Sequence, residues 1–280
     1  MNVPVTLEQS LRALWGASEL PFRENHTDRW LYADLERVEQ TLDRYVGLPA
    51  SGLLSGPNGV GKTWLLDHFL QRLPETRFVA LRLSHSTLTG ADFIRRLCRL
   101  NGITPALRRA DNLQQLLEFW QRDGRLPLLA VDEAQNLSPS ALEELRLLNC
   151  ERTRQRGRET TAPFVLLLCG NDDLPPLLDL NTQAALRSRL SFQLRLAPWT
   201  ADLTAAYCAA QWQHVGVSVN PMDTQALGLL HAAAEGLPRT VNQIALNALL
   251  QALDQRQKTI TAQHVQTALD ALPWIGKNMF

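Results

Sequence analysis

Residues 56–63 read GPNGVGKT and contain every residue type that a phosphate-binding loop requires. Gly56, Gly61, Lys62 and Thr63 meet the pattern G-x-x-x-x-G-K-T in full. Glycines let successive backbone N–H groups face a polyphosphate, the lysine contacts the β- and γ-phosphates, and the threonine hydroxyl ligates Mg²⁺. We therefore expect ATP and Mg²⁺ as ligands. The predicted nucleotide contacts are the loop and the residue after it: Gly56, Pro57, Asn58, Gly59, Val60, Gly61, Lys62, Thr63 and Trp64.

Two adjacent carboxylates follow an apolar run about 70 residues downstream of the loop. The segment LPLLAVDE ends in Asp132 and Glu133, where the carboxyl end of a parallel strand would meet a ligand. Asp132 is predicted to orient Mg²⁺ together with Thr63, and Glu133 to polarise the water that attacks the γ-phosphate. The alternative is a strand end capped by two solvated acids. The intact phosphate-binding loop favours the metal site.

Four further polar residues are candidates for the same chemistry. Asn171 follows the apolar segment PFVLLLCG and is predicted to contact the attacking water or the γ-phosphate; the alternative is a turn-forming asparagine. Arg187 and Arg189, in LRSRL, are candidates for an arginine that reaches a neighbouring subunit's nucleotide. Arg239, in GLPRTVN, opens a helical segment and is a candidate for another phosphate contact. For all three arginines the alternative is an ordinary surface residue.

The elements that must position these residues alternate between strand-like and helix-like patterns after residue 48. This alternation predicts an α/β fold with a parallel sheet. The expected strands lie at 52–55, 77–83, 126–133, 163–170 and 190–196. The expected helices follow the loop at residues 64–73 and lie at 90–101, 112–121 and 138–151. Ser138-Pro139 predicts an N-cap followed by proline at the first helical position.

The pattern changes after Pro198, and the chain is expected to have three parts. Residues 1–48 contain two expected helices, near 7–15 and 32–45, and residues 49–198 form the nucleotide-binding α/β domain. Residues 199–280 show helical periodicity with no strand and are predicted to form a small all-helical domain with a C-terminal tail.

Composition limits the classes of function. The 280 residues carry a formal net charge of zero, so an anionic partner must be met by a local patch. Lys62 is the only lysine in the first 257 residues, which suits a catalytic assignment. Cysteines at 98, 150, 169 and 208 are too scattered for a disulfide framework or a zinc site. No signal peptide or membrane-length apolar run is evident, so we expect a cytoplasmic protein.

In order and spacing, GPNGVGKT, LLAVDEAQNLS, LLLCGN, LRSRL and GLPRTVNQIA resemble the AAA+ ATPases. More narrowly, the stretch DEAQNLSPSALEELRLLNCE resembles the ExeA-like (general secretion pathway A-type) ATPases, and LPF at 20–22 with WLY at 30–32 looks like their N-terminal signature. The resemblance covers roughly residues 18–272 and implies a three-layer P-loop AAA+ domain followed by a helical lid. The sequence departs from the family in reading RENHTD after LPF.

The resemblance also implies roles at the matching positions. Lys62 and Thr63 would be Walker A residues, Asp132 and Glu133 Walker B residues, and Asn171 sensor 1. Arg187 or Arg189 would be the arginine finger, a choice that the sequence leaves open, and Arg239 would be the sensor 2 arginine of the lid. The expected enzyme is a Mg²⁺-dependent ATP hydrolase.

Two kinds of partner system are compatible with this resemblance. The closing pattern LPRTVNQIALNALLQALDQRQKTITAQHVQTALDAL favours the branch similar to the target-selecting ATPases MuB, TniB and TnsC. That branch implies a ring or helical oligomer on double-stranded DNA, without sequence preference, and partners in a transposase and a target-site adaptor. The alternative is an ATPase of a secretion or type IV pilus system. No membrane segment or cell-wall-binding domain is evident in the sequence, so no membrane partner is expected.

Arginines after the second strand form the candidate DNA contact. Arg95, Arg96, Arg108 and Arg109 are its predicted members, with Arg99 in the same cluster. Each phosphate contact contributes modestly and in a salt-dependent way. The alternative is a solvated helix face. A second arginine group, in ERTRQRGRE at 151–159, is expected to be an exposed loop.

Overall fold

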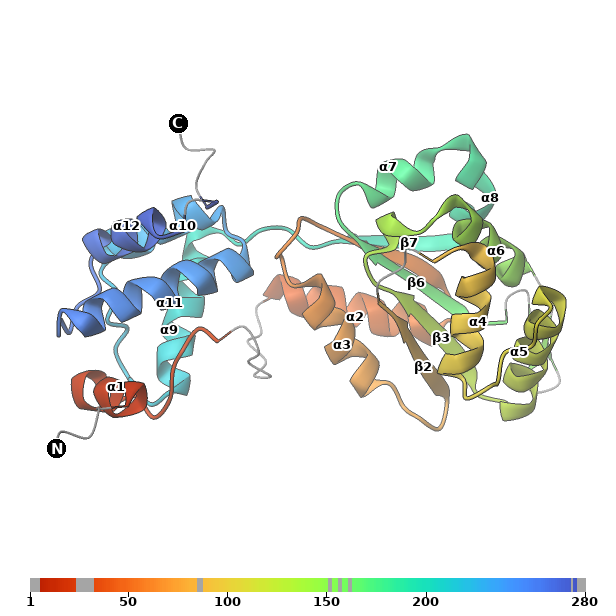
Figure 1. Ribbon diagram of the computed structural model, residues 1–280, viewed down its shortest axis with the longest axis horizontal. Helices are drawn as coiled ribbons and strands as arrows, with labels where there is room; N and C mark the ends of the chain where they lie inside the picture. The colour runs from red at the N-terminus through yellow and green to blue at the C-terminus, as the bar shows by residue number, and fades with distance from the viewer. Residues whose placement is uncertain are drawn as a thin grey trace. The chain divides into compact units, whose positions relative to one another are not determined.

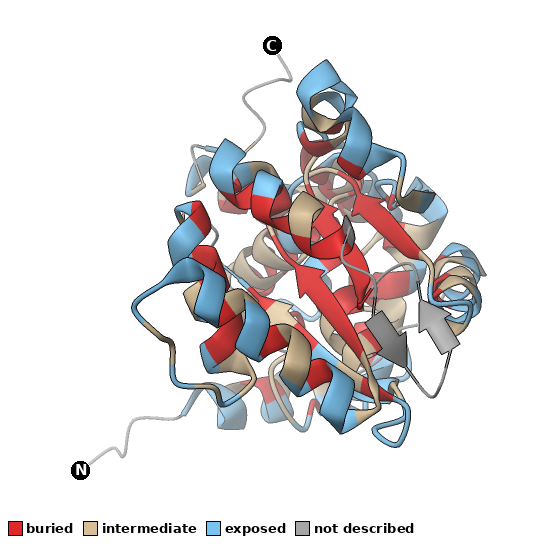
Figure 2. Ribbon diagram, turned by 90° about the vertical axis from the view of Figure 1, so that its right-hand side faces the viewer, coloured by how far each residue is buried: buried red, intermediate tan, exposed pale blue. Residues whose placement is uncertain are grey.

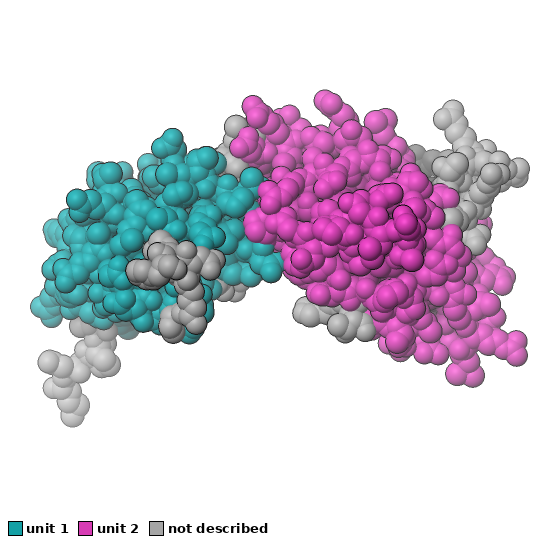
Figure 3. All heavy atoms as spheres, turned by 90° about the horizontal axis from the view of Figure 1, so that it is seen from above, with its two compact units in different colours: residues 1–33, 58–61, 197–280 teal, residues 34–57, 62–196 magenta. Residues whose placement is uncertain are grey.

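The computed structural model describes residues 6–23, 33–84, 88–150, 153–155, 158–160, 163–272 and 274–275. The chain divides into two compact units, drawn in different colours in Figure 3. Unit 1 comprises residues 1–33, 58–61 and 197–280, and unit 2 comprises residues 34–57 and 62–196.

A five-stranded parallel sheet forms the centre of unit 2 (Figure 1). Its strand order is β2-β3-β6-β1-β7, and the bounds are β1 Ser51–Ser55, β2 Phe78–Leu83, β3 Leu126–Val131, β6 Val165–Gly170 and β7 Leu190–Arg195. Every residue of β1 and of β6 is buried, because helices cover both faces of the sheet (Figure 2). Continuous apolar runs such as LLAV and VLLLCG are therefore the sequence signature of these strands.

The helices of unit 2 follow the strands along the chain. Their bounds are α2 Ala33–Gly47, α3 Lys62–Arg72, α4 Gly90–Leu100, α5 Arg109–Asp123, α6 Pro139–Cys150, α7 Leu174–Asp179 and α8 Ala184–Arg187. Apolar side chains of α4, α5 and α6 form one core cluster with alternate residues of the central strands, and Figure 1 shows α2 and α3 on the other side of the sheet. Ser138 caps α6 as expected, since its hydroxyl accepts the N–H of Ala141 at 3.2 Å.

Unit 1 is helical and contains both ends of the described chain. Its helices are α1 Leu7–Trp15, α9 Ala201–His214, α10 Thr224–Ala234, α11 Pro238–Asp254 and α12 Ala262–Asp270. Leu11 is fully buried in the core that α9 to α12 form, and Phe22 packs edge-on against Trp212 with ring centroids 6.0 Å apart. The indole of Trp15 donates to the Lys258 carbonyl at 2.7 Å. The segment of residues 7–22 therefore belongs to the helical core.

Some local expectations need correction. The segment 151–159, an expected loop, contains β4 Thr153–Gln155, which pairs antiparallel with β5 Arg158–Thr160. The glycine between two short polar segments is a hairpin signal, and pairing satisfies the backbone groups of both. The expected strand 126–133 ends at Val131, so both carboxylates lie beyond it. The WLY at 30–32 lies outside the described residues.

Candidate nucleotide-binding site

The loop between β1 and α3 adopts a backbone that glycine alone takes readily. Gly59 and Gly61 have φ values of 83° and 102°. Lys62, the first residue of α3, is 5% exposed, and its ammonium donates to the carbonyls of Gly56 at 2.8 Å and Pro57 at 3.0 Å. The lysine charge is therefore held at the loop, at the start of a helix whose first N–H groups favour an anion.

Thr63, in the first turn of α3, is in direct contact with Asp132, the residue that follows β3. The Thr63 hydroxyl donates to Oδ2 of Asp132 at 3.0 Å, and Asp132 is 3% exposed. Arg82 on β2 donates to the same oxygen at 3.0 Å and also pairs with Asp67. The backbone N–H of Glu133 donates to the other oxygen at 3.0 Å. These donors compensate the cost of a buried carboxylate.

The oxygen atoms at this point fit a magnesium ion. Mg²⁺ prefers hard oxygen ligands and is bound through one or two protein groups together with substrate phosphates and water. Thr63 and Asp132 supply one hydroxyl and one carboxylate of that kind. Within the described ranges no cluster of three or more His, Cys, Asp or Glu residues could hold a metal ion.

Glu133 has an unusual backbone conformation and a side-chain partner that the sequence did not indicate. Its φ and ψ are 52° and 41°, in the left-handed region, and Gln135 donates to its Oε2 at 2.6 Å. The amide oxygen of Gln135 accepts the backbone N–H of Asn171 at 3.2 Å. Gln135 therefore connects the residue after β3 to the residue after β6.

Asn171 also forms the local turn that was its alternative interpretation. Its Oδ1 accepts the backbone N–H of Asp173 at 3.0 Å, and its Nδ2 donates to the Asp173 carboxylate at 2.8 Å. Strand neighbours β3 and β6 thus bring Asn171 and Glu133 to one edge of the sheet. Sequence reasoning missed Gln135 and Arg82, because their roles depend on strand order and not on local spacing.

The three candidate phosphate-sensing arginines have different surroundings. Arg187 is half exposed and pairs with Asp179 at 2.9 Å. Arg189 donates to the Asn149 carbonyl at 2.9 Å. Arg239 is the second residue of α11, and its backbone N–H donates to the Gly59 carbonyl at 3.2 Å, both residues being in unit 1. Of the two finger candidates, Arg187 is an exposed residue and Arg189 is partly buried.

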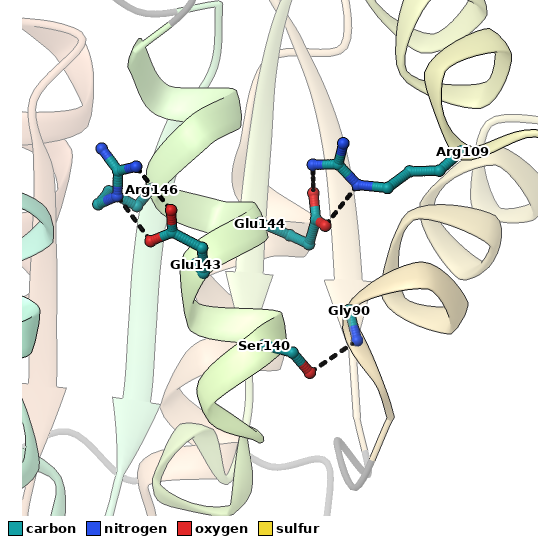
Figure 4. A network of polar contacts seen from close by, with 6 residues as sticks. All are labelled: Gly90, Arg109, Ser140, Glu143, Glu144 and Arg146. Atoms are coloured by element: carbon teal, nitrogen blue, oxygen red, sulfur yellow. Dashed lines mark hydrogen bonds and ion pairs between the residues drawn. The ribbon is translucent and has the colours of Figure 1, made fainter.

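The predicted DNA-contact arginines do not share one environment. Figure 4 shows the Arg109 guanidinium facing Glu144, with Nε donating at 2.6 Å, and this pairing raises the pKa of Arg109. Arg95 pairs with Asp92 at 3.2 Å. Arg95, Arg96 and Arg99 line a groove of about 570 Å³ whose other wall is residues 104–107. Arg108 is exposed at the start of α5 and does not line this groove.

Known proteins share this fold and part of this sequence. Residues 47–178 match the family model described as AAA domain. The fold is similar to Orc1 of Aeropyrum pernix in complex with DNA, with a TM-score of 0.65, 17% identity, and coverage of 90% of this chain and 68% of that one. A point mutant of RuvB from Thermotoga maritima gives a TM-score of 0.55 at 17% identity, covering 85% and 69% of the two chains. The expected P-loop AAA+ fold is confirmed. The match to the AAA domain also supports the expected ATP-hydrolysing activity.

A curated relative narrows the resemblance. The chain is 29% identical over 249 residues to General secretion pathway protein A of Aeromonas hydrophila. The match covers 85% of this chain but only 44% of that protein, so the chain spans less than half the relative's length. The expected resemblance to general secretion pathway A-type ATPases is therefore confirmed as a similarity of sequence over these 249 residues. No helix among the described residues is long and apolar enough to cross a membrane.

Proposed function

We propose that the chain hydrolyses ATP at the carboxyl edge of the sheet, with Lys62, Thr63, Asp132 and Glu133 as the reacting site. The observation that carries this assignment is the direct contact of Thr63 with Asp132 beside Lys62, whose ammonium is held at the loop by two carbonyls. Lys62 would exchange these carbonyls for phosphate oxygens, which are better partners for its charge. Gly56, Pro57 and the loop N–H groups would surround the phosphates.

Mg²⁺, held by Thr63 and Asp132, would neutralise charge that develops on the phosphate oxygens during transfer. Glu133 would orient the attacking water and accept its proton. Asn171 would contact the water or the γ-phosphate, for which its amide must leave Asp173. Trp64 follows the loop and is one of the predicted nucleotide contacts. Its ring stacks on His68 with centroids 5.3 Å apart, and this stacking would fix the position of the indole.

The scarcity of lysine makes the loop assignment easy to test. An acyl phosphate of ATP transfers its acyl group to a lysine amine beside the bound phosphates, and the nucleotide leaves. Mass spectrometry should find acylation at Lys62, with unmodified ATP protecting it, and little at Lys258. The variant Lys62→Ala should lose nucleotide binding, whereas the exposed control Lys258→Ala should keep it. Equal labelling of both lysines, unaffected by ATP, would refute the loop assignment.

We propose that the hydrolysis serves a secretion-type system, the alternative that the sequence left open. The likeness to General secretion pathway protein A supports this over the transposition interpretation. In the organism that encodes the chain, replacement by Glu133→Gln should reduce protein export into the medium while cellular levels of the exported proteins rise. Export at wild-type level with the variant would contradict the secretion role.

Transposition on DNA is the second candidate, and the arginine groove favours it. Arg96 and Arg99 are exposed on α4, and the groove that they line with Arg95 contains one acid, Asp92. Such a surface suits the phosphate backbone of DNA. In the transposition role, the protein partners of this chain would be a transposase and a target-site adaptor. ATP-dependent self-association would multiply weak contacts of each subunit.

Electrophoretic shifts of plain duplex DNA with a nonhydrolysable ATP analogue test this candidate. Binding should weaken steeply with salt, and Arg96→Ala with Arg99→Ala should flatten the salt slope by about two. The control Arg122→Ala removes an exposed arginine of α5 that pairs with Glu118. It should change neither the DNA affinity nor its salt slope. Absence of any shift at low salt would eliminate the DNA role and leave the secretion role.

A further inference from the structure

We propose that Gln135 is a positioning residue that fixes the Glu133 carboxylate relative to the strand end at Asn171. This inference rests on the proposed roles of Glu133 and Asn171 in hydrolysis. Gln135 lies in the 3-10 turn Ala134–Asn136 directly after Glu133. Its side chain spans two neighbouring strand ends, with one hydrogen bond at 2.6 Å to Glu133 and another at 3.2 Å from Asn171.

The chemistry of the two partners determines how the Gln135 amide is oriented. The carboxylate of Glu133 accepts only, so it requires the NH₂ end of the amide. The backbone N–H of Asn171 donates only, so it requires the amide oxygen. The flipped amide would place donor against donor and acceptor against acceptor. Gln135 therefore has one orientation in which both contacts are satisfied, and a shorter asparagine could not span the same two groups.

The strand on the other side of this contact leaves room for the amide. A Cβ atom at Gly170 would lie 2.5 Å from Oε1 of Gln135 and 2.6 Å from Cδ2 of Leu174. Any side chain at position 170 would therefore displace the Gln135 amide. The absence of a side chain there is a second feature, independent of Gln135 itself, that fits the amide in its observed place.

The left-handed backbone of Glu133 explains why its side chain needs the hydrogen bond from Gln135. Glutamate adopts this region of backbone space rarely, because the conformation is unfavourable for a side chain of its kind. The Glu133 side chain must nevertheless keep one orientation to direct a water in line with the γ-phosphate. The Gln135 amide holds one carboxylate oxygen and thereby fixes the direction of the whole group. Because the same amide accepts a hydrogen bond from Asn171, a displacement of Asn171 after β6 would also displace Glu133 after β3.

The test replaces the amide by a side chain of similar shape without polar donors. In Gln135→Met, kcat should fall by about 10-fold or more, the effect of one hydrogen bond to a charged group, while KM and analogue affinity stay within about twofold. Gln135→Glu keeps the acceptor for Asn171 but replaces the donor by a like charge, so it should be at least as impaired. The matched control is Gln114→Met, which removes an exposed glutamine-to-glutamate hydrogen bond of 2.9 Å on α5 and should leave kcat unchanged.

A double variant distinguishes positioning from a structural role. In a Glu133→Gln background, adding Gln135→Met should cause no further loss, because the residue acts through Glu133. An additive further loss, joint loss of kcat and analogue affinity, or an active Gln135→Glu would overturn the inference. If wild type hydrolyses ATP and Glu133→Gln does not, while Gln135→Met matches wild type, the inference alone fails. If wild type and Glu133→Gln hydrolyse ATP equally, the proposed function fails.

Discussion

The hydroxyl of Thr63 lies 3.0 Å from Oδ2 of Asp132 and joins the first turn of α3 to the end of β3. Arg82 donates to the same carboxylate oxygen from the neighbouring strand β2. Side chains from α3 and β2 thus meet at one oxygen atom of the residue that follows β3, which lies far from both in the sequence. A cation that binds there must share Asp132 with Arg82, which makes the affinity for Mg²⁺ sensitive to both donors.

Thr63→Ala is expected to weaken the magnesium dependence of the enzyme more than nucleotide binding itself. The half-saturating Mg²⁺ concentration for hydrolysis should rise by about 10-fold, consistent with the loss of one oxygen ligand. The control is Thr41→Ala on α2, where the hydroxyl donates to the Arg37 carbonyl at 2.7 Å. An unchanged Mg²⁺ titration in Thr63→Ala would remove Thr63 from the metal site.

Gly170→Ala should reproduce the effect of removing the Gln135 amide. The atoms that the new Cβ meets most closely are ends of flexible side chains, so the protein should fold while Gln135 moves. We expect a lower kcat with nearly unchanged affinity for an ATP analogue. The helical control Gly228→Ala has no neighbour within 4 Å of the new atom and should be neutral. A fully active Gly170→Ala would show that the amide tolerates displacement.

The choice between the two finger arginines can be made by their surroundings. The exposed pair of Arg187 with Asp179 contributes about 0–1 kcal/mol, so Arg187→Ala should fold normally. If Arg187 acts in trans, its loss should reduce kcat by about 10³-fold or more, and mixing with Lys62→Ala should restore part of the activity. Arg189→Ala should instead lower the unfolding temperature, because the Asn149 carbonyl loses its donor. Absence of rescue for both variants would argue against a shared site.

Burial of Cys208 predicts a dependence of stability on alkaline pH. Burial raises the pKa of this thiol to about 12, against about 8.5 in an unfolded chain. Between those values the unfolded state releases a proton that the folded state keeps, so the free energy of unfolding falls as pH rises. The expected slope is about 1.4 kcal/mol per pH unit for this thiol.

Denaturant unfolding at a series of pH values checks this slope. Cys208→Ala should be less stable than wild type near neutral pH because it leaves a cavity. The difference between the two proteins should then narrow as pH rises above about 9. Parallel curves over the whole range would mean that the thiol ionises alike in both states.

Much of the sheet could be predicted because its determinants are local. Apolar runs bounded by polar turns predicted the core strands, and the glycines with Lys62 and Thr63 predicted the loop. The contact of Gln135 with Asn171 could not be predicted, since it requires β3 and β6 to be neighbours although α6 and the β4–β5 hairpin lie between them in the sequence. The left-handed backbone of Glu133 could not be predicted either, because glutamate does not favour this conformation.

The packing of the N-terminal segment shows the same limit in unit 1. The apolar stripe of Leu7, Leu11, Leu14 and Trp15 predicted a helix but not the residues that pack against it. Leu11 is buried among residues of α9 to α12, at the opposite end of the sequence. A helical pattern indicates which face is buried, whereas the surface that covers it depends on the whole fold.

The most direct test of the account measures phosphate release and ATP affinity for Glu133→Gln beside wild type. The account predicts that the variant binds ATP and Mg²⁺ as wild type does but releases phosphate at least about 100-fold more slowly, because the water loses its base. The control Glu143→Gln removes an exposed glutamate of α6 that pairs with Arg146, and it should retain full turnover. Wild-type turnover in Glu133→Gln would contradict the assignment of the site.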